Sequence, residues 1–234
     1  MDIKQAIRHL SAGQDLDAGQ TAGLIREMMT GQCTDAQIAA FLVALQIKGI
    51  KTAELLGAAR VMRELATPVA VPPDAHLVDT CGTGGTGTDT FNISTSAAMV
   101  AACAGARVAK HGNRGATSKS GSADLLEAAG VNLGISPEQV AQCIQTLGVG
   151  FMFAPGHHSA MKHVIGPRRE IGVRTIFNML GPLTNPAGAP NQVMGVFAAE
   201  WIEPILDVLQ ELGSRHVLVL AADDGLDEIS LSAS

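Results

Sequence analysis

The sequence predicts an α/β protein with a small N-terminal helical domain and a larger α/β domain built on a mostly parallel central sheet. Two patterns predict this class: residues 1 to about 67 show helical periodicity, and from His76 onward short apolar strands alternate with helices. Such alternation is typical of βαβ units. Apolar residues make up 47% of the 234 residues, which is ample for a buried core. We place the helical domain at residues 1–70, with part of 160–185 packed on it, and the α/β domain at 74–234.

Residues typical of helix starts and ends predict two helices in the N-terminal part. Thr34 and Gln37 have the spacing of a capping box before an apolar run that ends at Gly49. A further helix is predicted from Thr52 to just before Pro68, because the residue that precedes a proline rarely stays helical. The stretch "TPVAVPPDAH" then reads as a linker.

Five short strands are predicted in the second part, with helices between them. The strands are "HLVDT", "ARVAK", "GFMFA", "NQVMGVF" and "HVLVLA". The helices are "STSAAMVAACAG", "SADLLEAAG", one that starts at Ser136 with Pro137 in its first turn, and "EWIEPILDVLQELG". Residues 156–181 form a helical and polar insertion before the fourth strand.

Charge and composition narrow the classes of partner. The net charge of −6 disfavours binding to bulk nucleic acid, and aromatic residues at 3% supply few surfaces for base stacking. No signal-peptide pattern is visible, and no apolar run reaches the roughly 18 residues of a membrane span. The four cysteines lack CxxC spacing, so we expect reduced core thiols in a cytoplasmic protein: Cys33, Cys81, Cys103 and Cys143.

A glycine-rich segment after the first strand predicts a phosphate or pyrophosphate site. Glycines let backbone N–H groups approach an anion, and a helix start near Ser94 adds a positive dipole end. The expected donors are the N–H groups of Gly82, Gly84, Gly85 and Gly87 and the hydroxyls of Thr90, Ser94 and Thr95.

Other interpretations of this segment remain open. Gly82-x-Gly84-x-x-Gly87 matches a dinucleotide fingerprint, but polar residues delay the helix and Lys110 stands where an acid is needed. A P-loop motif is absent from the sequence, and a glycine turn without a ligand is the plain structural alternative.

A second polar segment follows the second strand. Lys110 lies at that strand's carboxyl end, where α/β sheets bind ligands. Any one of the following polar residues suits an ordinary loop, but as a set they suggest a second wall of the phosphate site: His111, Asn113, Arg114, Ser118, Lys119 and Ser122. The acidic run "DDGLDE" reads by composition as a solvated turn, and the order of His157, His158 and His163 does not favour a metal site.

These motifs together resemble the anthranilate phosphoribosyltransferase family. The resemblance rests on "GTGGTGTDTFNIST", "KHGNRGATSKSGSADLLEAAGVNL", "GVGFMFAPGHHSAMKHVIGPRREIGVRTIFNMLGPLTNPA" and "DGLDEISL", and it covers nearly the whole chain. It implies transfer of the 5-phosphoribosyl group from phosphoribosyl pyrophosphate to anthranilate with Mg²⁺, in tryptophan biosynthesis. It also implies an active site between the two domains and a homodimer formed through the helical domain.

The resemblance also implies roles for individual residues. Lys110 and His111 would be catalytic, His111 by bonding to anthranilate or taking its proton, although a purely structural bond is equally open. The donor would be held by Gly82, Gly85, Thr86, Thr90, Asn92, Ile93, Ser94, Thr95, Lys110, His111, Gly112, Asn113, Arg114, Gly115, Ala116, Thr117, Ser118 and Ser122. Anthranilate would contact Gly82, Asn113 and Arg168, and Mg²⁺ would be held by Ser94, Asp227 and Glu228.

The sequence departs from the family's pattern in two places. Thr86 replaces the acid of the usual GTGGD motif, and a neutral hydroxyl cannot offset a cation. Family chains also continue beyond "DGLDEISL", so we expect this chain to lack part of the sheet. These departures motivate an alternative, a non-catalytic relative of the same fold that binds nucleic acid or another phosphate-rich ligand.

Overall fold

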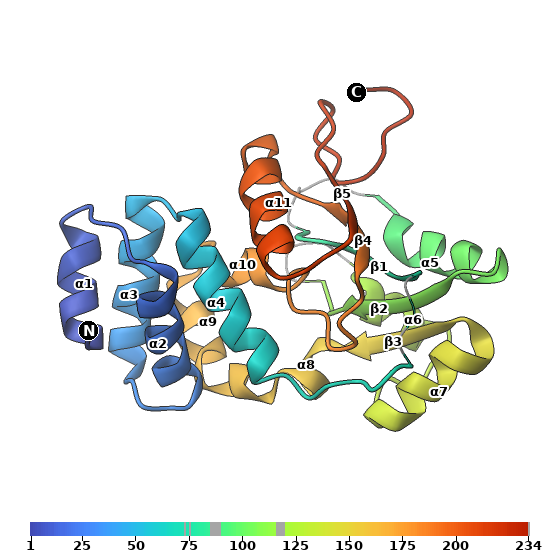
Figure 1. Cartoon of the computed structure of the whole chain (residues 1–234), viewed down its shortest axis with the longest axis horizontal. Helices are drawn as coiled ribbons and strands as arrows, with labels where there is room; N and C mark the ends of the chain where they lie inside the picture. Colours follow the sequence, from blue (N-terminus) through green and yellow to red (C-terminus); the bar gives the residue numbers. More distant parts are fainter. Residues whose placement is uncertain (73, 75, 85–89, 116–119, 234) are drawn as a thin grey trace.

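Four helices form the N-terminal unit of the computed structural model, which describes residues 1–72, 74, 76–84, 90–115 and 120–233. They are α1 (Ile3–Ser11), α2 (Ala18–Met29), α3 (Asp35–Lys48) and α4 (Thr52–Glu64), at the left of Figure 1. The predicted capping box is confirmed, because the Thr34 hydroxyl accepts from the Gln37 amide at 3.3 Å. The predicted helix end at Gly49 is confirmed as well.

The described residues of the second unit form a five-stranded sheet in which every pairing is parallel. The strands are β1 (Leu77–Gly82), β2 (Arg107–Gly112), β3 (Val149–Phe153), β4 (Asn191–Gly195) and β5 (His216–Leu220), in the order β3-β2-β1-β4-β5. The predicted fold class is therefore confirmed. One boundary is wrong: His111 and Gly112 belong to β2 and not to the following loop, because they continue its pairing with Met152 and Phe153 of β3.

Helices connect the strands and cover the sheet. Helix α5 (Ile93–Cys103) packs on β1 and β2, and α7 (Pro137–Leu147) packs on β3 after the short α6 (Ser122–Ala128). The 3₁₀ turn η2 (Ala199–Trp201) leads into α11 (Ile202–Glu211), which contacts both β5 and α4. Figure 1 shows α11 between the sheet and the helical unit.

The insertion between β3 and β4 joins the two units. It contains α8 (Ala154–His157), η1 (Ser159–His163), α9 (Ile165–Ile171) and α10 (Phe177–Leu180). Here η1 contacts α2, α9 contacts α3, and α10 contacts α4. Among the described residues, one cluster of buried apolar side chains runs from Phe41 through Leu180 to Met194 and Val208. The helical unit is thus fixed against the end of the sheet.

The cysteines and helix lengths bear on two expectations. Each of the four cysteines, all within the described ranges, carries a free thiol. Cys81 is buried, but Cys103 is exposed at the end of α5, so the expectation of four core thiols is wrong for that residue. Within the described residues, none of the helices combines the length and apolar character that crossing a bilayer requires.

Candidate active site

A cavity opens at the carboxyl ends of β1 and β2, where parallel sheets bind their ligands. Its volume is about 680 Å³, which suits small-molecule ligands. One wall comes from the strand ends and the start of α5, and the facing wall comes from α4, η1, α9 and α10. The predicted site residues that line it are Gly82, Thr90, Asn92, Ile93, Ser94, Lys110, His111, Gly112, Asn113, Arg114, Gly115, Ser122, Arg168, Asp227 and Glu228.

The glycine segment carries the chain from β1 to α5. Gly84 has a φ of +63°, a conformation that favours glycine. Helix α5 begins at Ile93, and Ile93 and Ser94 line the cavity. The Ile93 N–H donates to the Phe91 carbonyl at 2.8 Å, and the Ser94 N–H donates to Glu228. Gly85 and Thr86, predicted here as donor ligands, lie outside the described residues.

Thr95 is placed differently from its prediction. It is 1% exposed and is not on the cavity wall, and its hydroxyl donates to Ser122 Oγ at 2.9 Å. This bond joins the start of α5 to the start of α6. Thr95 therefore supports the two segments that reach the cavity instead of facing a ligand itself.

Lys110 is a buried residue near the carboxyl end of β2, which lies between β3 and β1 in the sheet. Its side chain is 2% exposed, and Nζ donates to the Thr80 carbonyl and, at 3.2 Å, to Ser94 Oγ. Burial lowers the pKa of Lys110, and the negative charges of Asp79 and Glu228 oppose that shift. The ammonium is thus held in a fixed position beside the first turn of α5.

Asp227 and Glu228 return to the same edge from the segment after β5. Burial raises the pKa of both carboxyl groups, and the backbone N–H groups of Gly84 and Ser94 respectively oppose the shift. A Cβ atom on Gly82 would lie 3.2 Å from Asp227 Oδ2, which shows how closely the acidic segment approaches the glycine segment. Asp227 and Glu228 are therefore part of the cavity wall, whereas Asp223 and Asp224 of the same run lie in an exposed turn, as the composition predicts.

His111 faces the opposite side of β2 from Lys110, because consecutive strand residues alternate between the two faces. Its ring is 5% exposed, and Nδ1 lies 3.1 Å from the Gly181 carbonyl. Burial and the neighbouring His158, whose ring centroid is 5.1 Å away, lower the pKa of His111 to about 3. The ring is thus neutral at pH 7, and donation from Nδ1–H to Gly181 leaves Nε2 as an acceptor without a partner in the described structure.

Asp79 supports this side of the cavity from within the sheet. It is fully buried, Oδ1 accepts from the His111 N–H at 3.1 Å, and Oδ2 accepts from Asn185 Nδ2 at 2.7 Å. Asn185 also donates to the Ala109 carbonyl at 2.8 Å. Burial raises the pKa of Asp79, and Lys110 and these donors oppose the shift. The turn that carries Gly181 is thereby tied to the end of β2.

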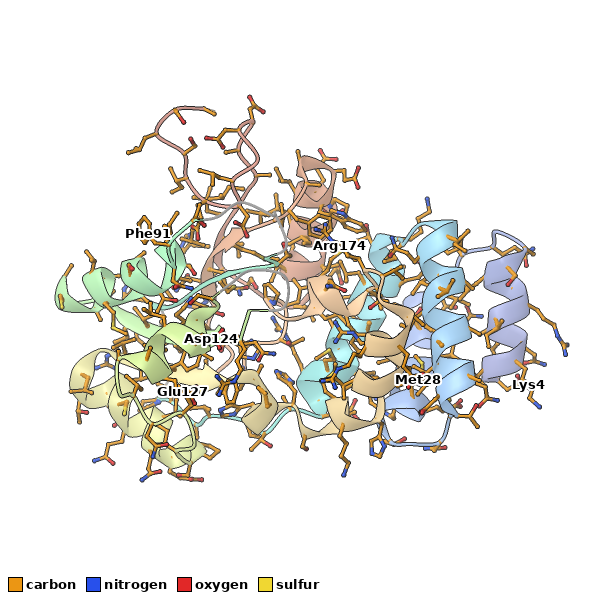
Figure 2. All side chains as sticks on the ribbon, turned by 180° about the vertical axis from the view of Figure 1, so that it is seen from behind. Lys4, Met28, Phe91, Asp124, Glu127 and Arg174 are labelled. Atoms are coloured by element: carbon orange, nitrogen blue, oxygen red, sulfur yellow. The ribbon has the colours of Figure 1, made fainter. Side chains whose placement is uncertain are left out.

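Two arginines mark the wall contributed by the insertion. The Arg168 guanidinium lies 5.1 Å from the centroid of Phe177, and that of Arg174 lies 4.3 Å from the centroid of Phe197. Both arginines line the cavity, and burial lowers the pKa of Arg168. Figure 2 places Arg174 on the side of the helical unit and Phe91 on the α5 side. Cations over aromatic rings suit a ligand that is both aromatic and anionic.

The second polar segment contributes backbone more than charge. Gly112, Asn113 and Gly115 line the cavity, but the Arg114 guanidinium pairs with Glu127 at 2.7 Å and with Asp124 at 3.2 Å. The expected donor ligands Ala116, Thr117 and Ser118 lie outside the described residues. Arg114 is therefore already engaged by two carboxylates.

Family comparisons agree with this architecture. The helical bundle domain of a glycosyl transferase family matches residues 4–66, and the a/b domain of that family matches residues 74–234. The anthranilate phosphoribosyltransferase of Ectopseudomonas mendocina (strain ymp) is 62% identical over 233 residues, which is 100% of this chain and 67% of that protein. The enzyme of Thioalkalivibrio sulfidiphilus is likewise 62% identical, with 69% of its length covered.

The chain belongs to the anthranilate phosphoribosyltransferase family. Solved structures of family members share its fold. The enzyme from Thermus thermophilus superposes with a TM-score of 0.89 and 47% identity, over 97% of this chain and 68% of that one. The enzyme from Saccharomyces cerevisiae in complex with PRPP and Mg gives 0.90 and 27% over the same shares. The chain spans about two thirds of the length of these relatives.

Some cavity residues of this family member were missed by the sequence reasoning. Met62, His158 and Arg174 line the cavity, and Asp79 supports it. His158 was considered only as a metal ligand, yet burial and His157 lower its pKa to about 4. The sequence could have indicated the supporting role of Asp79, since an acid inside an apolar strand needs buried partners. Nothing in the sequence indicates that Met62 lines a cavity, because a methionine on a helix face is typical of the hydrophobic core.

Proposed function

We propose that the chain transfers the 5-phosphoribosyl group from phosphoribosyl pyrophosphate to the amine of anthranilate, giving N-(5-phosphoribosyl)anthranilate and pyrophosphate. One observation carries this proposal: Lys110 and His111 are adjacent on β2, so they lie on opposite faces of the strand, and both line one cavity. We divide the cavity accordingly into a Lys110 half and a His111 half. The Lys110 half holds cationic and N–H groups beside two carboxylates. The His111 half holds the neutral imidazoles of His111 and His158, and Arg168 over the Phe177 ring would complete it. The first half suits a sugar diphosphate with its metal ion, and the second suits a small aromatic acid.

In the donor half, the backbone would bind the diphosphate. The first turn of α5 and Lys110 Nζ would lie beside the leaving group, where negative charge develops. Because Lys110 is already fixed by Thr80 and Ser94, no reorganisation is needed as the C1–O bond breaks. Thr90, Asn92 and the backbone of Gly112–Gly115 would complete this half, together with Gly85, Thr86 and Ala116–Ser118.

The carboxylates of this half fit Mg²⁺. Asp227 and Glu228 are hard oxygen donors, and burial raises the pKa of each, as expected for acids that await a cation. Mg²⁺ is commonly bound by one or two carboxylates together with substrate phosphates. Asp227, Glu228 and Ser94 would hold it. When bound, Mg²⁺ would neutralise charge on the pyrophosphate.

In the acceptor half, Arg168 would clamp the anthranilate carboxylate, since its planar fork matches that geometry. Gly82 and Asn113 would lie against the aromatic acid. The amine nitrogen forms a bond to C1 of the ribose while pyrophosphate leaves with the electron pair of the C1–O bond. His111 Nε2 accepts the amine N–H and then its proton, and a weak base suffices because the alkylated aromatic amine is strongly acidic while it carries that proton.

We also propose an oligomeric state and a cellular location. The family resemblance favours a homodimer through the helical unit, where Ile47 on α3 is 81% exposed, and a cytoplasmic location. Light scattering of the purified protein would measure its mass in solution. We also propose the domain division at 1–70 and 74–234, with part of 160–185 packed on the helical unit; the contacts of η1, α9 and α10 with α2, α3 and α4 support it.

The direct test is to incubate the protein with anthranilate, phosphoribosyl pyrophosphate and Mg²⁺ and to follow the loss of anthranilate fluorescence. We expect loss that requires all three components. A folded protein that gives no turnover, and instead binds DNA in a salt-sensitive manner, would overturn the proposal and favour the non-catalytic alternative.

A further inference from the structure

Asp124, in the first turn of α6, bonds to two backbone groups that lie six positions apart. Its Oδ2 accepts from the Gly115 N–H and the Gly121 N–H, each at 2.8 Å. These two bonds are the largest causes that lower the pKa of Asp124. One carboxylate oxygen therefore joins the two sides of the second polar segment.

The backbone on these two sides is in direct contact. A Cβ atom on Gly121 would lie 2.6 Å from the Arg114 carbonyl carbon and 2.7 Å from the Asn113 oxygen, closer than real Cβ atoms approach. The Ala123 N–H also donates to the Asn113 carbonyl at 3.2 Å. Residues 113–115 and 121–123 are thus held side by side, and only glycine fits at position 121.

Arg114 belongs to the same arrangement. Glu127 accepts from its two terminal nitrogens at 2.7 and 3.0 Å, and Asp124 Oδ1 accepts at 3.2 Å. The guanidinium also lies 5.5 Å from the ring centroid of Phe153 at the end of β3. Figure 2 shows Asp124 and Glu127 near each other, on the side of the molecule away from the helical unit. Arg114 offsets the charge of a carboxylate that would otherwise repel a nearby anion.

We propose that Asp124 is a positioning residue for the sugar-diphosphate donor. It acts through the backbone: by joining Gly115 to Gly121 it holds Asn113, Arg114 and Gly115 against the cavity, so that their polar groups are in place before the donor binds. The Arg114 guanidinium is engaged by Asp124 and Glu127 and is not a free ligand for phosphate. The inference rests on the proposed function, because it assumes that this cavity binds a diphosphate.

The test compares Asp124→Ala and Asp124→Asn with the matched control Glu127→Gln. Glu127 lies on the same helix and binds the same arginine, but it bonds to neither Gly115 nor Gly121. For Asp124→Ala we expect the KM for phosphoribosyl pyrophosphate to rise about ten-fold or more, with the KM for anthranilate and kcat within about three-fold of wild type. Asp124→Asn keeps one acceptor oxygen and should be intermediate, and Glu127→Gln should stay within about two-fold.

Binding of inorganic pyrophosphate with Mg²⁺, measured by calorimetry, provides a readout without turnover. Asp124→Ala should weaken it to a similar extent, and Asp124→Asn serves where the alanine variant fails to fold. An unchanged donor KM and pyrophosphate affinity in Asp124→Ala, or a parallel loss in kcat and both KM values, would overturn the positioning role alone. Absence of turnover in the wild-type protein would overturn the proposed function instead.

Discussion

Replacing His111 with Asn tests whether the imidazole is held neutral by burial. The unfolded chain has a histidine pKa near 6.5, and the folded protein lowers the pKa of His111 to about 3. Between these values the unfolded state binds more protons than the folded state, so stability is greatest above pH 6.5 and falls as the pH is lowered toward 3. Asparagine can still donate a hydrogen bond to the Gly181 carbonyl.

The size of the effect follows from the shift. Between pH 7 and pH 5, protonation of one such histidine in the unfolded chain costs the folded protein about 2 kcal/mol. His158, whose pKa is lowered to about 4, adds a similar amount, so the wild-type protein should lose about 4 kcal/mol from this pair. His111→Asn should lose about half of that.

Urea denaturation at pH 7, 6 and 5 measures the free energy of unfolding directly. The matched control is His216→Asn at the start of β5, because that side chain is exposed in the folded protein. If His111→Asn and wild type lost the same stability between pH 7 and pH 5, the ring would not be buried and neutral as described, and its role as an acceptor for the amine would fail with it.

Three further changes probe other parts of the molecule. Glu54→Ala should lower the free energy of unfolding by about 3–5 kcal/mol in urea denaturation, because the buried carboxylate accepts from Lys48 Nζ at 2.9 Å and from two backbone N–H groups. The control is Glu64→Ala, which removes an exposed ion pair and should cost less than about 1 kcal/mol in the same assay. Arg168→Lys should raise the KM for anthranilate about ten-fold and leave the donor KM unchanged in steady-state kinetics, because an ammonium lacks the fork. Gly195→Ala should raise the Mg²⁺ concentration for half-maximal activity, since the new Cβ would overlap the backbone of Asp227.

Each of these has an outcome that contradicts it. Equal costs for Glu54→Ala and Glu64→Ala would show that the buried ion pair adds nothing specific. A rise in the donor KM of Arg168→Lys would place that residue in the wrong half of the cavity. An unchanged Mg²⁺ requirement in Gly195→Ala would separate the acidic segment from the metal ion.

The fold could be predicted because local signals agreed with tertiary packing. Thr34 with Gln37 starts α3, and Pro137 begins α7. The end of β2 could not be placed, because His111 is polar and the pairing that keeps it in the strand comes from β3, distant in sequence. The exposure of Cys103 also depends on which side of α5 meets the sheet, and the mostly small side chains of this helix do not reveal it.

The sequence predicts the cavity residues at the ends of β1 and β2 better than those of the facing wall. A cluster of glycines and hydroxyl side chains after a strand is typical of an anion-binding site, and Lys110 at the end of a neighbouring strand adds a positive charge to it. Arg114 looked like a phosphate ligand because its partners on α6 lie ten and thirteen positions away. His158 and Arg174 reach the cavity through the path of the insertion, which sequence periodicity does not specify.

The most direct test is a crystal structure of the protein with phosphoribosyl pyrophosphate and Mg²⁺. We predict the diphosphate against the first turn of α5, within hydrogen-bonding distance of Ser94 and on the same side of β2 as Lys110, with the ion beside Asp227 and Glu228. A donor bound elsewhere, with the end of β1 and the start of α5 free of phosphate, would contradict the assignment of this sheet edge as the donor site.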